Sequence, residues 1–258
     1  MRALKLLSGD DMPMLGLGTW DLRGSEATRA VATALELGYR HIDTAWMYEN
    51  QQAVGAGIRA SGVAYDEIFL TSKIWHTDLA ADAARAQHEE NLSQLGFDYV
   101  DLLLVHWPRD DVPLAETLGA FAQLAASDKT RAIGVSNFSQ AQVDEARQVC
   151  EAPICVNQVR YNLLEAPDAV RRHCQDLGVV VTAYTPTTKG SVYSDATVAA
   201  AAEAHGKTPA QVCLRWLVQQ EIVVIPKAAS EAHQRDNMEL FDWALSDAEM
   251  TALGQIAG

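Results

Sequence analysis

The feature of this chain that most limits its possible folds is a regular alternation of short apolar runs with helical patterns. Eight runs have the length and apolar character of buried strands, and they lie near 15–19, 39–43, 67–73, 99–106, 131–135, 154–158, 178–184 and 222–226. Repeated strand–helix units of this kind build parallel α/β folds, because each helix returns the chain to the start of the next strand.

Helical periodicity fills the intervals between these runs. The helical segments are Ala27–Leu37, Gln52–Ala60, Ala80–Leu95, Leu114–Ala126, Ala141–Cys150, Ala166–Asp176, Asp195–His205 and Pro209–Gln220, with a final one near Asp247–Ile256. In one of them, Thr208 is a suitable N-cap and Pro209 a suitable first residue. Eight strands with their helices in 258 residues predict a (β/α)₈ TIM barrel that forms a single domain over 1–258.

A doubly wound open sheet is the competing fold, and it usually carries a glycine-rich turn after its first strand. Gly55 and Gly57 lie inside a helical pattern instead, so they are a poor dinucleotide fingerprint. The barrel is therefore favoured. The segment before Met14 is expected to form a short hairpin that closes the bottom of the barrel.

Composition limits the classes of partner. The formal net charge of −14 disfavours nucleic acid and anionic membranes, although a locally positive pocket can still bind an anionic cofactor. The four cysteines lack C-x-x-C spacing and are expected to be reduced residues of a cytoplasmic protein. The N-terminus lacks the long apolar segment of an export signal, so export is not expected. No run approaches the roughly 18 apolar residues of a membrane span. A monomer is expected.

Three of the apolar runs end in an ionisable residue: Asp43, Lys73 and His106. Tyr48 follows Asp43 by five residues. Each residue alone has an ordinary explanation, such as a turn-forming aspartate, a packing tyrosine, a solvated lysine or a core histidine. Because the carboxyl ends of parallel barrel strands meet at one rim, the four side chains are predicted to converge on a proton-transfer site.

The chemistry of these four groups is complementary. A free tyrosine has a pKa near 10, and the ammonium of Lys73 is expected to lower the pKa of Tyr48 by favouring its phenolate. Asp43 is expected to hold Lys73 in place and to raise the pKa of its amine. His106, expected to be neutral, would bond a substrate carbonyl. Tyr48 is therefore predicted to act as a general acid towards a carbonyl oxygen.

The residues around these four resemble the aldo-keto reductase superfamily over nearly the whole chain. The matching segments are Gly16–Trp20, Gly38–Ala45 with Tyr48 and Asn50, Ser72–Lys73, Val105–Pro108, Gly134–Phe138, Val156–Gln158 and Ile225–Lys227 with Asn237. The resemblance implies a nicotinamide dinucleotide, usually NADPH, extended across the mouth of the barrel. It also implies reduction of aldehydes and ketones by hydride transfer.

The same resemblance assigns cofactor-binding roles to individual residues. It implies that Ser136, Asn137 and Gln158 hold the carboxamide and that Tyr184 stacks on the nicotinamide ring. The residues implied to line the route to the ribose and to clasp the rest of the cofactor are Thr19, Trp20, Asp43, Lys227, His233 and Asn237.

The chain departs from the family at the expected adenosine phosphate site. Ala228 and His233 stand where the family often has a serine and an arginine, which removes donors for a 2′-phosphate. Lys227 remains, and Arg235 is a possible substitute donor. These departures predict use of NADPH with weakened discrimination against NADH.

The substrate pocket is predicted to be aromatic and open. Its expected lining residues are Trp20, Met47, Tyr48, Trp75, His106 and Trp107. The C-terminal loop that closes this pocket in the family is expected to be missing. The pattern looks most like bacterial reductases of small aldehydes, dicarbonyls and keto-sugars, including the 2,5-diketogluconate reductase group.

Two other functions remain open from the sequence. A Schiff-base lyase or aldolase can use a strand-end lysine such as Lys73, but it needs a lysine with a lowered pKa. A barrel without activity could serve as a nucleotide sensor. No metal site is expected, because His76, His88, His173 and His205 lack the spacing that zinc requires.

Overall fold

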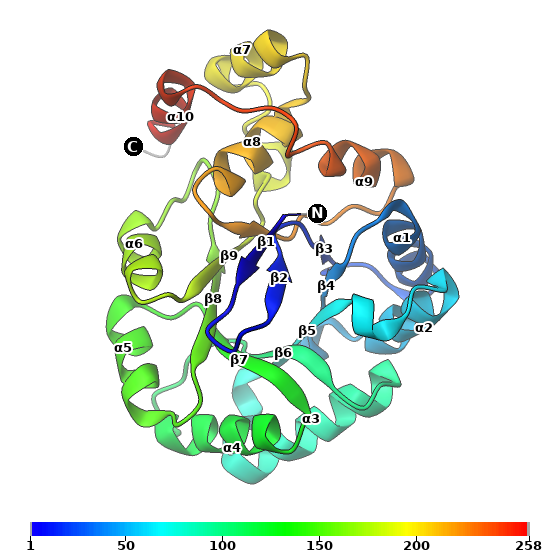
Figure 1. Cartoon of the computed structure of the whole chain (residues 1–258), viewed down its shortest axis with the longest axis vertical. Coiled ribbons are helices and arrows are strands. Elements are labelled where there is room, and N and C mark those ends of the chain that lie inside the picture. Colours follow the sequence, from blue (N-terminus) through cyan, green and yellow to red (C-terminus); the bar gives the residue numbers. More distant parts are fainter. Residues whose placement is uncertain (1, 257–258) are drawn as a thin grey trace.

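The strands of the barrel follow one another in space in the same order as in the chain. The computed structural model describes residues 2–256. Eight parallel strands form one sheet (Figure 1): β3 (Leu17–Gly18), β4 (His41–Asp43), β5 (Phe69–Ile74), β6 (Val100–Val105), β7 (Thr130–Ser136), β8 (Ile154–Arg160), β9 (Val180–Tyr184) and β10 (Val223–Val224). A parallel bridge between Leu15 and Val224 joins the two edges of the sheet. The sheet therefore closes, and the predicted TIM-barrel fold is confirmed.

The helices lie outside the ring of strands in Figure 1. They are α1 (Gly24–Leu37), α2 (Gln51–Ser61), α3 (Ala81–Leu95), α4 (Leu114–Ala126), α5 (Gln140–Val149), α6 (Asp168–Asp176), α7 (Ala196–His205), α8 (Pro209–Val218), α9 (Glu231–Met238) and α10 (Asp247–Gly254). The predicted start of α8 is confirmed, since Thr208 accepts a hydrogen bond from Gln211 N and Pro209 is the first helical residue.

Helix α9 has no counterpart among the predicted helices. Its eight residues are mostly polar, and its buried positions are Gln234 and Asn237 rather than an apolar stripe. Hydrophobic periodicity therefore could not reveal it. The last helix ends at Gly254, two residues before the predicted Ile256. The expected absence of a C-terminal loop concerns the chain beyond residue 256, which lies outside the described residues.

The N-terminal hairpin closes the bottom of the barrel, as predicted. Strands β1 (Ala3–Lys5) and β2 (Asp11–Pro13) pair in antiparallel fashion and lie across the centre of the ring in Figure 1. Leu6 and Met12 are buried in a cluster with apolar residues of the strands, including Leu102, Leu104 and Val156. The hairpin therefore leaves the carboxyl ends of the strands as the open side of the barrel.

The two glycines of α2 serve packing between helices. A Cβ on Gly55 would lie 1.9 Å from the carbonyl oxygen of Leu95, and one on Gly57 would lie 2.6 Å from that of Thr28. These glycines let α2 approach α1 and α3 closely, in agreement with their exclusion as a phosphate-binding turn. Within residues 2–256, no helix is both long and apolar enough to cross a bilayer.

Candidate active site

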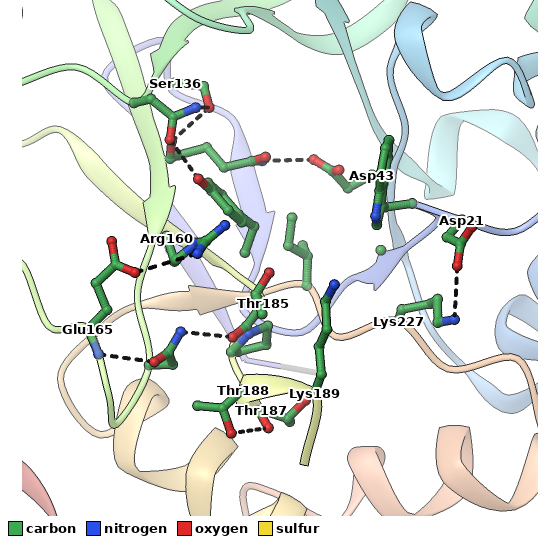
Figure 2. A pocket seen from close by; sticks show the side chains of 18 of the residues that line it. Asp21, Asp43, Ser136, Arg160, Glu165, Thr185, Thr187, Thr188, Lys189 and Lys227 are labelled. Carbon is green, nitrogen blue, oxygen red and sulfur yellow. Dashed lines mark hydrogen bonds and ion pairs between the residues drawn. The ribbon is translucent and has the colours of Figure 1, made fainter. Parts of the chain in front are cut away.

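A cavity of about 960 Å³ opens at the carboxyl ends of the barrel strands (Figure 2). The final residues of five strands line it: Gly18, Asp43, Ser136, Arg160 and Tyr184. This is the edge at which parallel barrels carry their chemistry, because the loops that follow the strands are free to differ there.

The four ionisable side chains predicted to converge lie together at this cavity, where Asp43, Tyr48 and His106 line the wall and Lys73 lies behind them. Lys73 Nζ lies 2.6 Å from Asp43 Oδ1 and 3.3 Å from the hydroxyl of Tyr48. The rings of Tyr48 and His106 lie 5.7 Å apart in an edge-on arrangement. Strands β4 and β5 position Asp43 and Lys73, whereas a single turn of 3₁₀ helix at Trp46–Tyr48 brings Tyr48 back over them.

Asp43 is held from both sides. Its Oδ1 accepts the lysine bond, and its Oδ2 accepts a bond of 2.8 Å from Gln158 Nε2 across the barrel. The backbone N–H and the hydroxyl of Thr19 both donate to the carbonyl oxygen of Asp43. A buried carboxylate is stable only with such partners, so Thr19 and Gln158 fix the position of Asp43.

Lys73 is fully buried and makes three hydrogen bonds. Besides Asp43 and Tyr48, the carbonyl oxygen of Thr44 accepts from Nζ at 2.9 Å. An ammonium has three N–H groups, which matches these three acceptors. Burial lowers the pKa of Lys73 below its ordinary value, although the charge of Asp43 and its hydrogen bond oppose this. Asp43 raises the pKa of Lys73 as expected, but desolvation is the larger effect, so the net shift is downward.

The pKa of Tyr48 also differs from the sequence expectation. Burial raises it well above 10, and the charges of Asp43 and Tyr184 act in the same direction. The predicted lowering of the pKa of Tyr48 by Lys73 is therefore wrong. The phenolate would lose its hydration in this buried position, and a neighbouring ammonium does not compensate for that loss. Tyr48 consequently holds its proton firmly.

His106 follows β6 and is neutral. Burial lowers the pKa of its imidazole to about 2, with smaller contributions from the charges of Lys73 and His76. Its Nδ1 is buried and has no hydrogen-bond partner among residues 2–256. The expected neutral state of His106 therefore agrees with its surroundings.

A polar group that includes Ser136 and Asn137 lies on the opposite wall. Asn137 Nδ2 donates to Ser136 Oγ at 3.0 Å and to the carbonyl oxygen of His106 at 3.1 Å. Ser136 Oγ donates in turn to the carbonyl oxygen of Gln158. Tyr184 donates its hydroxyl to Asn137 Oδ1 at 2.9 Å, which holds its ring at the edge of the cavity. The structure thus gathers these four predicted cofactor residues in one wall.

The residues predicted to bind substrate do not all line the cavity. Trp20, Met47 and Trp107 line the cavity. The rings of Trp20 and Tyr48 pack edge-on, with 5.1 Å between their centres. Trp20 and Trp107 are 45% and 42% exposed, so the mouth has an open apolar rim. Trp75 is not part of the lining; it packs edge-on against His106 with 5.0 Å between ring centres.

The predicted clasp residues are also divided. Lys227 lines the cavity, and its Nζ lies 4.0 Å from Asp21 Oδ2 on the same side of the cavity (Figure 2). His233 is exposed on α9 and does not line the cavity, and Asn237 is buried beside Tyr39. Arg235 forms an exposed ion pair with Glu231 at 2.7 Å and does not line the cavity.

Sequence reasoning missed the segments that follow β8 and β9. Arg160 and Glu165 line the cavity, as does Lys189 within the stretch Thr185–Ser191. Lys189 has a positive φ of 53°, which shows a tightly turned loop. These segments carry no periodic pattern, and the only available signal was their position directly after a predicted strand. The result is a cavity with three lining cations, Arg160, Lys189 and Lys227, on a strongly acidic chain.

Among residues 2–256, His, Cys, Asp and Glu side chains form no group of three or more that could hold an ion. All four cysteines are free, and three of them are buried: Cys155, Cys174 and Cys213.

Comparison with known proteins agrees with this architecture. The model of the Aldo/keto reductase family matches residues 14–257. The glyoxal reductase of Bacillus subtilis is 39% identical over 248 residues, covering 96% of this chain and 90% of that protein. An aldo-keto reductase of Mycolicibacterium smegmatis is 37% identical over 254 residues, covering 98% and 92%.

Solved structures give the same result. A protein described as a candidate 2,5-diketo-D-gluconic acid reductase B superposes with a TM-score of 0.95 at 40% identity, covering 99% of this chain and 91% of that one. The aldo-keto reductase of Bombyx mori, solved in complex with NADP, gives a TM-score of 0.93 at 31% identity, covering 98% and 92%.

Proposed function

The chain belongs to the aldo/keto reductase family and is an oxidoreductase, and from this premise we propose that it reduces small aldehydes, dicarbonyls and keto-sugars with a nicotinamide dinucleotide. The observation that carries the proposal is the position of the Tyr48 hydroxyl. It lies in the cavity wall, 3.3 Å from the amine of Lys73, which is itself fixed by Asp43.

The cavity suits the proposed cofactor in charge and in shape. Lys189 and Lys227 supply cations for phosphate groups on a chain whose net charge is −14. The amides of Asn137 and Gln158 and the hydroxyl of Ser136 match the donors and acceptors of a carboxamide. Tyr184 offers a ring for stacking at the same wall. When bound, the reduced nicotinamide supplies a hydride to the carbonyl carbon.

The protein's own contribution is the proton. Tyr48 would donate its hydroxyl proton to the carbonyl oxygen as that oxygen gains negative charge, so the alcohol forms with one hydride and one proton added. Lys73 would then stabilise the phenolate left on Tyr48, and Asp43 keeps Lys73 in place. Neutral His106 would orient the carbonyl oxygen. The raised pKa of Tyr48 keeps the acid protonated until substrate is present.

The alternative use of Lys73 as a Schiff-base nucleophile has little geometric support. Its pKa is lowered, as that chemistry requires, but its side chain is fully buried and does not line the cavity. Nothing in the described residues favours a nucleotide sensor without activity, because the proton-donating group is in place.

The substrate class follows from the open rim and from the relatives. Trp20 and Trp107 form an exposed apolar entrance, which suits small carbonyl compounds with few polar contacts. One relative is named as a glyoxal reductase, and one structural neighbour is described as a candidate diketogluconate reductase. We therefore expect low selectivity among small aldehydes and dicarbonyls.

We further propose that NADPH is used with only a weak preference over NADH. Lys227 is the cation that would meet a 2′-phosphate, whereas Ala228 has no hydroxyl and Arg235 does not line the cavity. A panel of aldehydes, dicarbonyls and keto-acids, each assayed with both cofactors, tests this. Values of kcat/KM within about tenfold of each other support the proposal, and a preference of about a thousandfold would contradict it.

A matched variant isolates the phosphate site. His233→Arg should tighten NADPH and leave NADH unchanged, because only NADPH carries the 2′-phosphate that an arginine can grip. Equal tightening of both cofactors would show that position 233 acts on another part of the molecule. The measurement is the Kd of each cofactor by calorimetry.

A further inference from the structure

Arg160 is the cation of the cavity that stands against an aromatic ring. It ends β8 and is paired in register with Tyr184, which ends β9. Its guanidinium carbon lies 5.8 Å from the centre of the Tyr184 ring, within the range of a cation–π contact. The chain's other two lining cations, Lys189 and Lys227, make no such contact among the described residues.

The ring of Tyr184 cannot easily move away from this charge. Its hydroxyl is fixed to Asn137 Oδ1 at 2.9 Å, and its backbone continues into Thr185, which has a positive φ of 53°. Burial raises the pKa of Tyr184, whereas the charge of Arg160 and a hydrogen bond between the two side chains lower this pKa. The field of Arg160 therefore reaches the phenol ring.

An ion pair with Glu165 partly offsets the charge of Arg160. Glu165 Oε2 lies 3.7 Å from Arg160 Nη1, and the two side chains are 59% and 53% exposed (Figure 2). An exposed pair of this kind is weak, since water screens both charges. Arg160 therefore keeps much of its positive field at the edge of the cavity.

We propose that Arg160, acting through the ring of Tyr184, weakens the binding of oxidised dinucleotide relative to reduced dinucleotide. The proposal rests on the proposed function, in which the nicotinamide stacks on this ring. The oxidised nicotinamide carries a positive charge, whereas the reduced ring is neutral. A cation drawing electron density from the tyrosine ring makes that ring a poorer partner for a second cation and leaves a neutral ring almost unaffected.

The consequence is a bias towards carbonyl reduction. Product release limits the turnover of many enzymes, so faster departure of the oxidised cofactor would favour the reductive cycle. Arg160 is a positioning residue in this account, because it acts on the cofactor through Tyr184.

The test is the ratio of Kd for NADP⁺ to Kd for NADPH, measured by calorimetry without substrate. Arg160→Gln should lower this ratio by about threefold, the size expected of an exposed cation–π contact. Arg160→Lys should retain most of the bias because it keeps the charge. Glu165→Gln should raise the ratio, since it removes the counter-ion.

Lys189→Gln is the matched control. It removes a cavity cation that does not touch the ring, so it should weaken both dinucleotides equally and leave the ratio unchanged. The inference is overturned if Arg160→Gln shifts both Kd values equally, or if Arg160→Lys behaves like Arg160→Gln. If the unmodified protein binds neither dinucleotide, the proposed function fails, and this inference fails with it.

Discussion

At the scale of single residues, burial has the largest effect on the pKa values of Tyr48 and Lys73. Charge pairing alone predicts a phenol of low pKa and a lysine of raised pKa. Burial reverses both, because each ion would lose its hydration inside the barrel. The residues themselves are visible in the sequence, since each ends a strand or follows one closely. The extent of their burial depends on the assembled barrel and could not be seen there.

These ionisations predict an unusual pH profile for carbonyl reduction. Burial raises the pKa of Tyr48, the proposed proton donor, well above 10 and lowers the pKa of His106 to about 2. Neither group changes its charge between about pH 5 and 9, so kcat/KM should show no inflection near 6.5, where a free histidine titrates. Any decrease should come as the pH rises, because Lys73, whose pKa is lowered by burial, then loses its proton.

The profile is measured from initial rates in overlapping buffers at constant ionic strength. An inflection near pH 6.5 that disappears in His106→Gln would contradict this account, because it would show that His106 ionises in the working pH range. The same inflection persisting in that variant would point to a different group.

At the scale of elements, glycines in two helices differ in how closely their surroundings pack against them. Gly55 in α2 lies against the backbone of Leu95, whereas Gly119 in α4 has no atom within 4 Å of the position a Cβ would take. The sequence shows both as glycines in helical patterns. The difference arises from the contact between helices, which no local pattern encodes.

Alanine at these two positions should therefore change stability in opposite directions. Gly119→Ala should raise the free energy of unfolding by about 0.5–1 kcal/mol, because alanine favours the helix. Gly55→Ala should lower it by about 1–3 kcal/mol, because the backbone of Leu95 has to shift. Urea unfolding followed by circular dichroism measures both. A stabilised Gly55→Ala would show that α2 and α3 are less tightly packed than described.

Elements with buried apolar faces were predicted well, and those with polar roles were not. The strands appear as apolar runs because a parallel sheet is covered on both sides. Helix α9 buries the amides of Gln234 and Asn237, and the loops after β8 and β9 line the cavity. Neither produces hydrophobic periodicity, so neither could be predicted from the apolar pattern of the chain.

At the scale of the whole molecule, the barrel has a closed end and an open end. Met12 of the N-terminal hairpin is fully buried among the strands, whereas Leu7 in the same hairpin is 46% exposed. The closed end supplies stability, and the carboxyl end carries the cavity. This separation lets the loops of the cavity adopt strained conformations such as that of Lys189.

Shortening the side chains of these two hairpin residues to alanine tests whether the closed end of the barrel supplies stability. Met12→Ala should lower the free energy of unfolding by about 2–5 kcal/mol, the cost of a large cavity in a core. Leu7→Ala should change it by less than about 0.5 kcal/mol, because that side chain is largely in solvent. Both variants should keep their Kd for NADPH. Equal effects of the two substitutions on stability would contradict a sealing role for the hairpin.

The central claim is that a neutral phenol, Tyr48, protonates the carbonyl oxygen beside Lys73. Its most direct test combines the reduction of a small aldehyde by Tyr48→Phe with the Kd of NADPH in the same variant. The account predicts that kcat falls by about a hundredfold or more while Kd changes little, since only the donated proton is removed. A variant that keeps most of its kcat, or that loses cofactor binding in parallel with activity, would contradict it.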